Sequence, residues 1–213
     1  MQVFGRALSA AEIRMRMKTC FRPVPPVPPK PTRPPPTASP KVCNRRIDLG
    51  FLIDVSSRVG RTNIKYIRLY VKEMVRRFRV TSRLTRVGIV TYSSRQRRII
   101  RLTRARSNRD VNRALGRIQI RRGRRRTGSG LRYAKRYLFE GKPKCGRKRV
   151  LIVLTTGASA DGVRRPAKSL ENIGVEIFVV VPNKGGRKQM HQIATSRLHV
   201  VTMAYARLIN IVA

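Results

Sequence analysis

The sequence predicts an open, doubly wound α/β domain, in which helices cover both faces of a mostly parallel sheet and a proline-rich linker precedes them. Three observations predict this fold class. Short apolar runs alternate with segments of helical periodicity from Arg46 onward, the runs VLIVL (150–154) and IFVVV (177–181) are apolar throughout, and residues 23–40 read PVPPVPPKPTRPPPTASP. Strands without polar alternation are typical of a parallel sheet buried between helices.

The first half of the domain alternates strands and helices. Ile64, Ile67, Val71 and Met74 recur at helical spacing, which indicates an amphipathic helix. In chain order we expect a strand at 49–53, a helix at about 62–79, a strand at 87–92, an edge strand at 99–102 and a helix traced by Val111, Leu115 and Ile118.

The second half continues the same alternation. We expect a helix at 131–139, the strand 150–154, a helix with the face Ala167, Leu170 and Ile173, the strand 177–181, a short helix around Met190, a strand near Val200 and a closing helix around Leu208. The expected strand order is 3-2-1-4-5-6, and ligands of such sheets bind beyond the carboxyl ends of the strands. The loops of interest therefore begin at Asp54, near Arg122 and at Thr155.

The chain divides into three parts. Proline fixes φ and removes backbone donors, so residues 20–42 are expected to be an extended linker. Residues 43–213 form the α/β domain, and residues 1–19 are expected to be the tail of an upstream domain. No apolar stretch reaches the roughly 18 residues of a membrane helix, and the N-terminus lacks the apolar run of a secretory signal.

The charge of the chain indicates a polyanionic partner. Fifty Lys and Arg residues oppose nine Asp and Glu residues, a formal net charge of +41. Such a charge raises the local concentration of polyanions, and the planar guanidinium of arginine binds phosphate, sulfate or carboxylate through two parallel hydrogen bonds. The alternative is a basic surface that is only solvated.

Enzymatic catalysis is not predicted. His191 and His199 have no nucleophile or carboxylate pair near them in the sequence, and no Gly-x-Gly-x-x-Gly or Gly-Lys-Ser loop follows the first strand. We expect both histidines to be ordinary structural or surface residues and the chain to be non-enzymatic.

Five motifs in order carry a resemblance to a known family. They are DVSSRVG (54–60), KYIRLYVKEMVRRF (65–78), VGIVTYSS (87–94), TGSGLRYA (127–134) and VLIVLTTG (150–157). Over about residues 46–212 the chain resembles the von Willebrand factor type A domain, which implies a Rossmann-like fold and a role in adhesion. Residues 1–19, with the run ALSAAEI, resemble the end of a laminin-G-like or pentraxin-like domain, which implies that they are the tail of an upstream extracellular domain. Because the N-terminus lacks a secretory signal, an extracellular location would make the chain a fragment or a partial gene model.

The resemblance also implies a metal-ion-dependent adhesion site that this chain has largely lost. Asp54 and Ser56 match two of its ligand positions, whereas Arg58, Arg125 and Thr156 replace the other three. Guanidinium groups cannot ligate a cation. We therefore expect no Mg²⁺ and no other cofactor, and we expect Asp54 to cap nearby backbone donors and to pair with Arg58 or Arg125.

Anion binding is the alternative use of the same edge. Backbone amides at a helix N-terminus favour anions, and those of Gly128, Ser129 and Gly130 lie beside several arginines. The predicted anion-binding residues are Arg58, Arg124, Arg125, Arg126, Thr127 and Ser129. Arg121 and Arg122 of the run RRGRRR (121–126), together with Arg95, Arg97 and Arg98, would extend a basic rim around them. Arginine-rich runs are also often only solvated loops.

The three cysteines indicate one disulfide and one spare thiol. Cys43 precedes the first strand and Cys145 precedes the fourth, and these strands are parallel neighbours in the expected order. A Cys43–Cys145 disulfide is therefore predicted, and it implies an extracellular setting. Cys20 would pair with an upstream domain or with another chain.

Together these features predict a secreted, non-enzymatic binding module of the extracellular matrix, acting in cell adhesion. Its expected partner is a matrix protein or a sulfated glycan, bound largely without metal. The alternative is a basic nucleic-acid-binding protein, which the same charge would allow. The chain has six Phe, six Tyr and no Trp, mostly in predicted core positions, so few aromatic rings are left for base stacking.

Overall fold

The computed structural model describes residues 46–141, 146–181 and 187–202. All of them belong to the unit Pro40–Ala213. The predicted tail (1–19), the linker (20–42), the closing helix around Leu208 and the three cysteines lie outside the described residues, so these expectations remain predictions.

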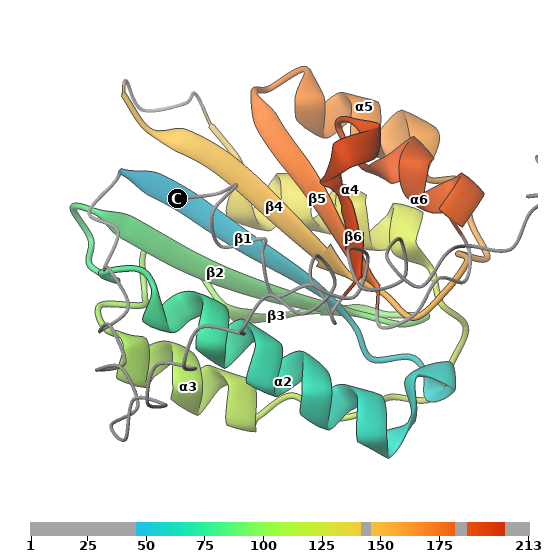
Figure 1. Cartoon of the computed structure of the whole chain (residues 1–213), viewed down its shortest axis with the longest axis horizontal. Coiled ribbons are helices and arrows are strands. Elements are labelled where there is room, and N and C mark those ends of the chain that lie inside the picture. The colour runs from blue at the N-terminus through green and yellow to red at the C-terminus, as the bar shows by residue number, and fades with distance from the viewer. Residues whose placement is uncertain (1–45, 142–145, 182–186, 203–213) are drawn as a thin grey trace, which may run out of the picture. The chain divides into compact units, whose positions relative to one another are not determined.

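A central sheet with the strand order β3-β2-β1-β4-β5-β6 runs through the described part of the chain (Figure 1). Its strands are β1 (Ile47–Asp54), β2 (Thr85–Tyr92), β3 (Gln96–Ile100), β4 (Lys148–Leu154), β5 (Val175–Val181) and β6 (Val200–Thr202). Among the strand pairs of the described residues, only β2–β3 is antiparallel. The predicted order and the edge position of β3 are confirmed, although β3 begins three residues earlier than expected because a tight turn pairs Tyr92 with Gln96.

Two layers of helices cover this sheet. The helices are α2 (Gly60–Arg76), α3 (Asn108–Gly116), α4 (Thr127–Leu138), α5 (Arg164–Glu171) and α6 (Arg187–Ile193), with short 3-10 turns η1 (Ser57–Val59) and η2 (Arg197–His199). α4 begins at Thr127, four residues before the predicted start. None of the described helices is long and apolar enough to cross a membrane.

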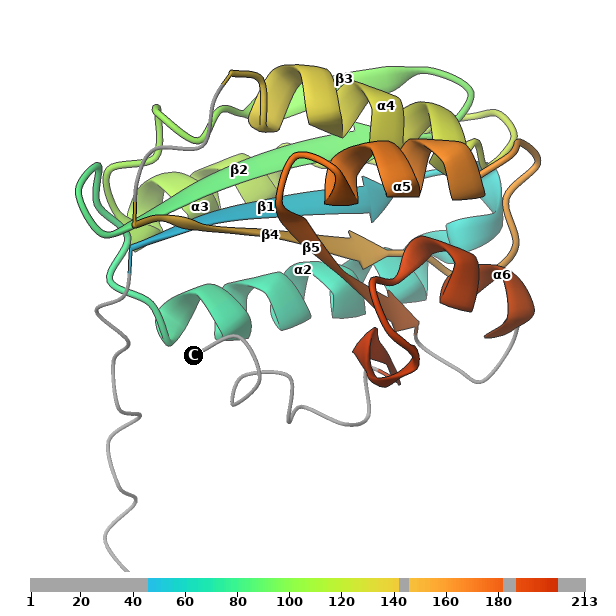
Figure 2. The ribbon, with the colours of Figure 1, turned by 90° about the horizontal axis from the view of Figure 1, so that it is seen from above.

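Alternation along the strands divides the core into two clusters. Phe51 and Ile53 of β1 pack with α2 and α3, whereas Leu52 between them packs with α4 and α5. Figure 2 shows α2 on one side of the sheet and α4 and α5 on the other. All eight residues of β1 are buried, so the central strand is a fixed platform for the loop that follows it.

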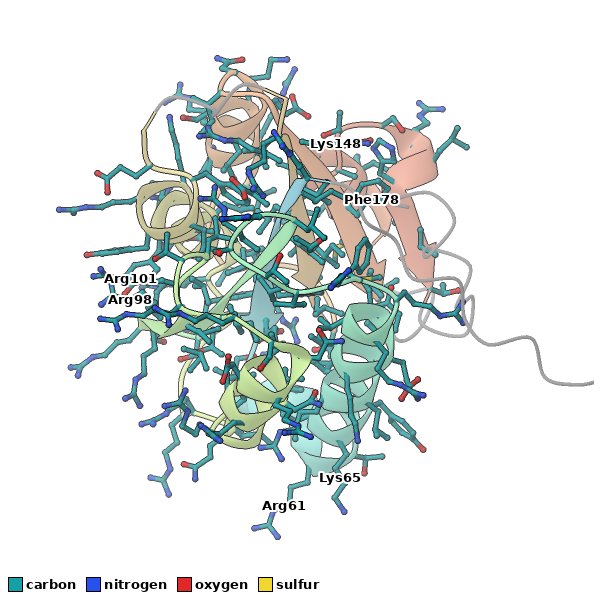
Figure 3. The ribbon with its side chains drawn as sticks, turned by 90° about the vertical axis from the view of Figure 1, so that its left-hand side faces the viewer. Arg61, Lys65, Arg98, Arg101, Lys148 and Phe178 are labelled. Atoms are coloured by element: carbon teal, nitrogen blue, oxygen red, sulfur yellow. The ribbon has the colours of Figure 1, made fainter. Side chains whose placement is uncertain are left out.

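Basic side chains cover much of the outer surface. Arg61 and Lys65 project outward from α2, and Arg98 and Arg101 project outward at β3 (Figure 3). Phe178 of β5, in contrast, is fully buried under this surface. In the described part of the chain, most basic side chains are therefore exposed around an apolar core, whereas Arg125 and Arg149 are buried.

Candidate functional site

The carboxyl ends of the central strands bring the Asp54 carboxylate to the edge where the family's metal site would lie. Asp54 is the last residue of β1, lies opposite Tyr92 of β2 and is completely buried. Its Oδ1 accepts a hydrogen bond from the Ser56 amide at 2.9 Å. The predicted capping of backbone donors by Asp54 is therefore present.

The Arg125 guanidinium satisfies the second oxygen of Asp54. Arg125 Nε donates to Asp54 Oδ2 at 2.5 Å, and the Arg125 side chain is only 8% exposed. Its Nη1 donates to the Ala158 carbonyl at 3.1 Å, and its Nη2 donates to the Thr156 hydroxyl at 2.6 Å. All three nitrogens of the guanidinium are thus bound within the protein, which is what a buried cation requires. Of the two predicted partners of Asp54, the structure selects Arg125.

This donor set does not fit a divalent cation. The Asp54 carboxylate is occupied by a guanidinium, and a metal ion placed there would meet that positive charge at contact distance. Ser56 Oγ is buried without a hydrogen-bond partner among the described residues, so it is one free oxygen, but a hydroxyl alone does not hold Mg²⁺. Within the described part of the chain, no cluster of three or more His, Cys, Asp or Glu side chains is present.

A buried tyrosine connects β2 to the start of α4 at this site. The Thr127 hydroxyl donates to the Tyr92 hydroxyl at 3.1 Å, and both residues are buried. Burial raises the pKa of Tyr92 well above its usual value, and the negative charge of Asp54 raises it further. Tyr92 is therefore a neutral anchor between β2 and α4.

Asp161, a residue that the sequence analysis missed, closes the N-terminus of α4. Its Oδ1 accepts from the Gly128 amide, and its Oδ2 accepts from the Ser129 amide, each at 2.8 Å. Burial raises the pKa of the Asp161 carboxyl, but hydrogen bonds from the hydroxyls of Ser159 and Ser129 and from these two amides hold it below its usual value. The chain has only nine acidic residues, so an Asp in the loop after β4 could have been recognised from the sequence as a candidate functional residue.

The amides at this helix start, which were predicted to bind an external anion, are hydrogen-bonded within the protein. The Thr127 amide donates to Ser159 Oγ, and the Gly130 amide donates to the Arg126 carbonyl, so neither is free. Asp161 already supplies the negative charge that the helix N-terminus favours. The side chain of Thr127 is directed at Tyr92, and the Ser129 hydroxyl donates to Asp161 at 2.7 Å. Neither side chain is available to a ligand, contrary to expectation.

The remaining predicted anion-binding residues lie at the surface of the same edge. Arg58 in η1 and Arg124 are exposed and line a cleft of about 390 Å³ together with the edge of Arg125 and the loop 158–160. Arg126 is exposed but does not line this cleft. The structure therefore brings Arg58 and Arg124 together and assigns Arg125 to an internal role.

The family model of the von Willebrand factor type A domain matches residues 48–211. Vitrin of Mus musculus is 33% identical over 67% of this chain and 22% of its own length, and human matrilin-1 is 28% identical over 70% and 30%. The human collagen alpha-5(VI) chain is 27% identical over 70% of this chain and 6% of its own length.

These relatives are extracellular matrix proteins, and the chain spans less than a third of the length of each. Among solved structures, the proximal thread matrix protein 1 of the mussel byssus, described with a zinc-occupied MIDAS motif, superposes with a TM-score of 0.72 at 22% identity over 81% of this chain and 46% of that one. The manganese-loaded TRAP protein of Plasmodium vivax gives a TM-score of 0.61 at 17% identity, over 71% and 63%. The predicted Rossmann-like fold is confirmed, and the chain belongs to the von Willebrand factor type A domain family.

Proposed function

We propose that this chain is a non-enzymatic binding module of the extracellular matrix that holds a protein or an anionic glycan without a metal ion. The observation that carries the proposal is the Arg125 guanidinium on Asp54. A divalent cation would have to displace a side chain that makes contacts to Asp54, Thr156 and Ala158. The internal guanidinium supplies the positive charge that the family's metal would otherwise bring to this carboxylate.

The charge distribution supports an anionic partner. With a net charge of +41, the surface attracts polyanions and accelerates their encounter with the domain. The kinship with matrix proteins supports an extracellular location and a role in adhesion. Catalysis has no support in the described residues, because the polar groups around Asp54 are bound to one another and no nucleophile with an adjacent base is among them.

Calorimetric titration of the full chain tests the proposal with three probes: heparin, poly-glutamate and a single-stranded oligonucleotide. Each titration is run with Mg²⁺ and again with a chelator, at low and at physiological salt. We expect saturable binding of heparin or poly-glutamate, with the same affinity in Mg²⁺ and in the chelator. Binding that disappears with the chelator would contradict metal independence, and binding of the oligonucleotide alone would favour the nucleic-acid alternative.

A further inference from the structure

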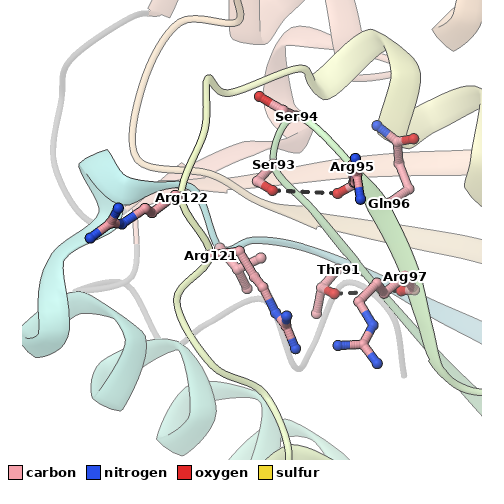
Figure 4. A pocket seen from close by; sticks show the side chains of 9 residues that line it. Thr91, Ser93, Ser94, Arg95, Gln96, Arg97, Arg121 and Arg122 are labelled. Carbon is pink, nitrogen blue, oxygen red and sulfur yellow. Dashed lines mark hydrogen bonds between the residues drawn. The ribbon is translucent and has the colours of Figure 1, made fainter.

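A second arginine-lined cleft lies beside the Asp54 site. It has a volume of about 460 Å³ and lies between the β2–β3 turn and the loop that joins α3 to α4 (Figure 4). Arg95 and Arg97 come from the first wall, and Arg121 and Arg122 come from the second. Figure 4 shows the side chains of Arg97 and Arg121 extending into the same space beside Thr91.

Hydrogen bonds fix the two walls relative to each other. The Arg121 amide donates to the Val55 carbonyl at 2.7 Å, and the Arg124 amide donates to Ser94 Oγ at 2.8 Å. Gly123, between them, has a φ of +124°, and a Cβ at this position would lie 2.4 Å from Ser94 Oγ. Only glycine allows this close approach, so the loop is held against the turn before any ligand arrives.

The register of β3 decides which arginines enter the cleft. Successive residues of a strand point to opposite faces, and Arg97 lines the cleft whereas Arg98 turns away. The Arg98 guanidinium lies 5.4 Å from the centre of the Tyr137 ring on α4. Arg98 therefore has a partner within the protein, and Arg97 faces the ligand side.

The four arginines of the cleft have no counter-charge among the described residues. All four are exposed, and none of their guanidinium groups donates to a described acceptor. None of the lining residues is acidic. Like charges gathered in one cleft repel one another, and an anion between them removes that repulsion while using the paired donors of each guanidinium. This differs from Arg125, whose nitrogens are all bound internally.

The other lining groups narrow the class of anion. The Thr91 and Ser93 hydroxyls donate to the Arg97 and Arg95 carbonyls, and Ser94 Oγ accepts from the Arg124 amide, so they are polar wall groups with only their remaining hydrogen-bonding capacity open to a sugar hydroxyl. Gln96 adds a side-chain amide, and Val55 is the one aliphatic side chain of the lining. The lining contains no aromatic ring, so a nucleic-acid base would find no stacking surface there. Sulfate groups on a hydroxyl-rich chain match both the arginines and the polar wall.

We infer that this cleft is the docking site for a sulfated glycan, with Arg97 and Arg121 as the principal sulfate ligands. The inference rests on the proposed function and names both the ligand class and the surface. The site is separate from the residues that replace the family's metal ligands, because Arg58, Arg125 and Thr156 do not line it.

The test is calorimetric titration of the full chain and three double variants with a short heparin oligosaccharide. Arg97→Gln with Arg121→Gln removes two cleft charges, and we expect binding to weaken at least about tenfold. Arg61→Gln with Lys65→Gln removes two exposed charges from α2. We expect this pair to change binding by less than about twofold, because it removes only long-range attraction, which salt screens. Arg97→Lys with Arg121→Lys keeps the charge but loses the planar fork, and we expect an intermediate loss. Thermal unfolding checks that each variant is folded.

Equal losses in the cleft and α2 variants would overturn the inference, because charge alone would then explain binding. So would an unchanged affinity of the Arg97 and Arg121 glutamine variant, although heparin binding by the unaltered chain would leave the proposed function in place. A chain that binds poly-glutamate but no heparin would likewise refute the glycan site alone. A single-stranded oligonucleotide that competes at the cleft with higher affinity than the glycan would replace the ligand class by nucleic acid.

Discussion

Arg125 Nε lies 2.5 Å from Asp54 Oδ2, so the carboxylate at the end of β1 holds an internal cation in place of a metal. The pair is nearly inaccessible to solvent, with side-chain exposures of 8% and 0%. A buried charge is tolerated only when it is paired and hydrogen-bonded. The loop that contains Arg125 and the loop after β4 are therefore tied to the sheet through one guanidinium.

Replacing Arg125 by Ala should destabilise the domain by about 3–5 kcal/mol, because Asp54 would remain buried without its partner. Urea unfolding followed by circular dichroism measures this change. Arg124→Ala is the control, since Arg124 is exposed and its substitution should stay within about 0.5 kcal/mol. In the double variant with Asp54→Ala, the loss should be clearly smaller than the sum of the two single losses. Additive losses would show that the pair is not coupled.

Restoring the family's ligands should restore metal binding. In a triple variant with Arg58→Ser, Arg125→Thr and Thr156→Asp, Asp54 and Ser56 regain oxygen partners and lose the competing guanidinium. We expect Mg²⁺ at about 100 times its Kd to stabilise this variant by about 2.7 kcal/mol and to leave the unaltered chain unchanged. Thermal unfolding with Mg²⁺ and with a chelator measures both. A shift of the unaltered chain by Mg²⁺ would contradict the assignment of Arg125.

Asp161 should make stability depend on pH in the acid range. Its folded pKa is held below the usual value, so its contribution is complete above the unfolded pKa near 3.9 and is lost as pH falls through the folded pKa. Because the group is partly exposed, we expect Asp161→Asn to cost only roughly 1 kcal/mol at neutral pH and to flatten the acid limb of the curve. Urea unfolding between neutral and acid pH tests this, with Glu140→Gln, at an exposed position just after α4, as a control. If stability fell as steeply at acid pH in the Asp161 variant as in the unaltered chain, another carboxyl would be responsible for the acid dependence.

Sequence reasoning found the sheet but not the details of its edge. Buried parallel strands could be predicted from the apolar runs at β4 and β5, and the order 3-2-1-4-5-6 is the usual one for a doubly wound sheet. The start of α4 could not, because Gly128 and Gly130 are poor helix formers and the capping carboxylate of Asp161 comes from more than 30 residues away. The choice between Arg58 and Arg125 as the partner of Asp54 also depended on distances that only the folded chain defines.

Which arginines enter the cleft also could not be predicted from the sequence. Arg95, Arg97, Arg98 and Arg121 could be assigned to a basic rim from the sequence, but the separation of Arg97 from Arg98 depends on the register of β3. That strand was predicted at 99–102 and occupies Gln96–Ile100. Near a sheet edge, turn geometry rather than hydrophobic pattern sets the register, so which arginine faces a ligand is decided by the fold.

The disulfide of Cys43 and Cys145, which lie outside the described residues, is a prediction that would join the segments preceding β1 and β4. Ile47 pairs with Lys148, and the Lys148 amide donates to the Arg46 carbonyl at 3.1 Å, so the two strands begin side by side. A disulfide that closes a loop of roughly 100 residues contributes about 4–5 kcal/mol in the chain-entropy model. We expect reduction, or the variant Cys43→Ser with Cys145→Ser, to lower the free energy of unfolding by up to that amount, whereas Cys20→Ser should leave it unchanged. Peptide mapping of the secreted protein under non-reducing conditions identifies the bond directly. Free thiols at both positions would refute the pairing and would remove the disulfide as an argument for an extracellular location.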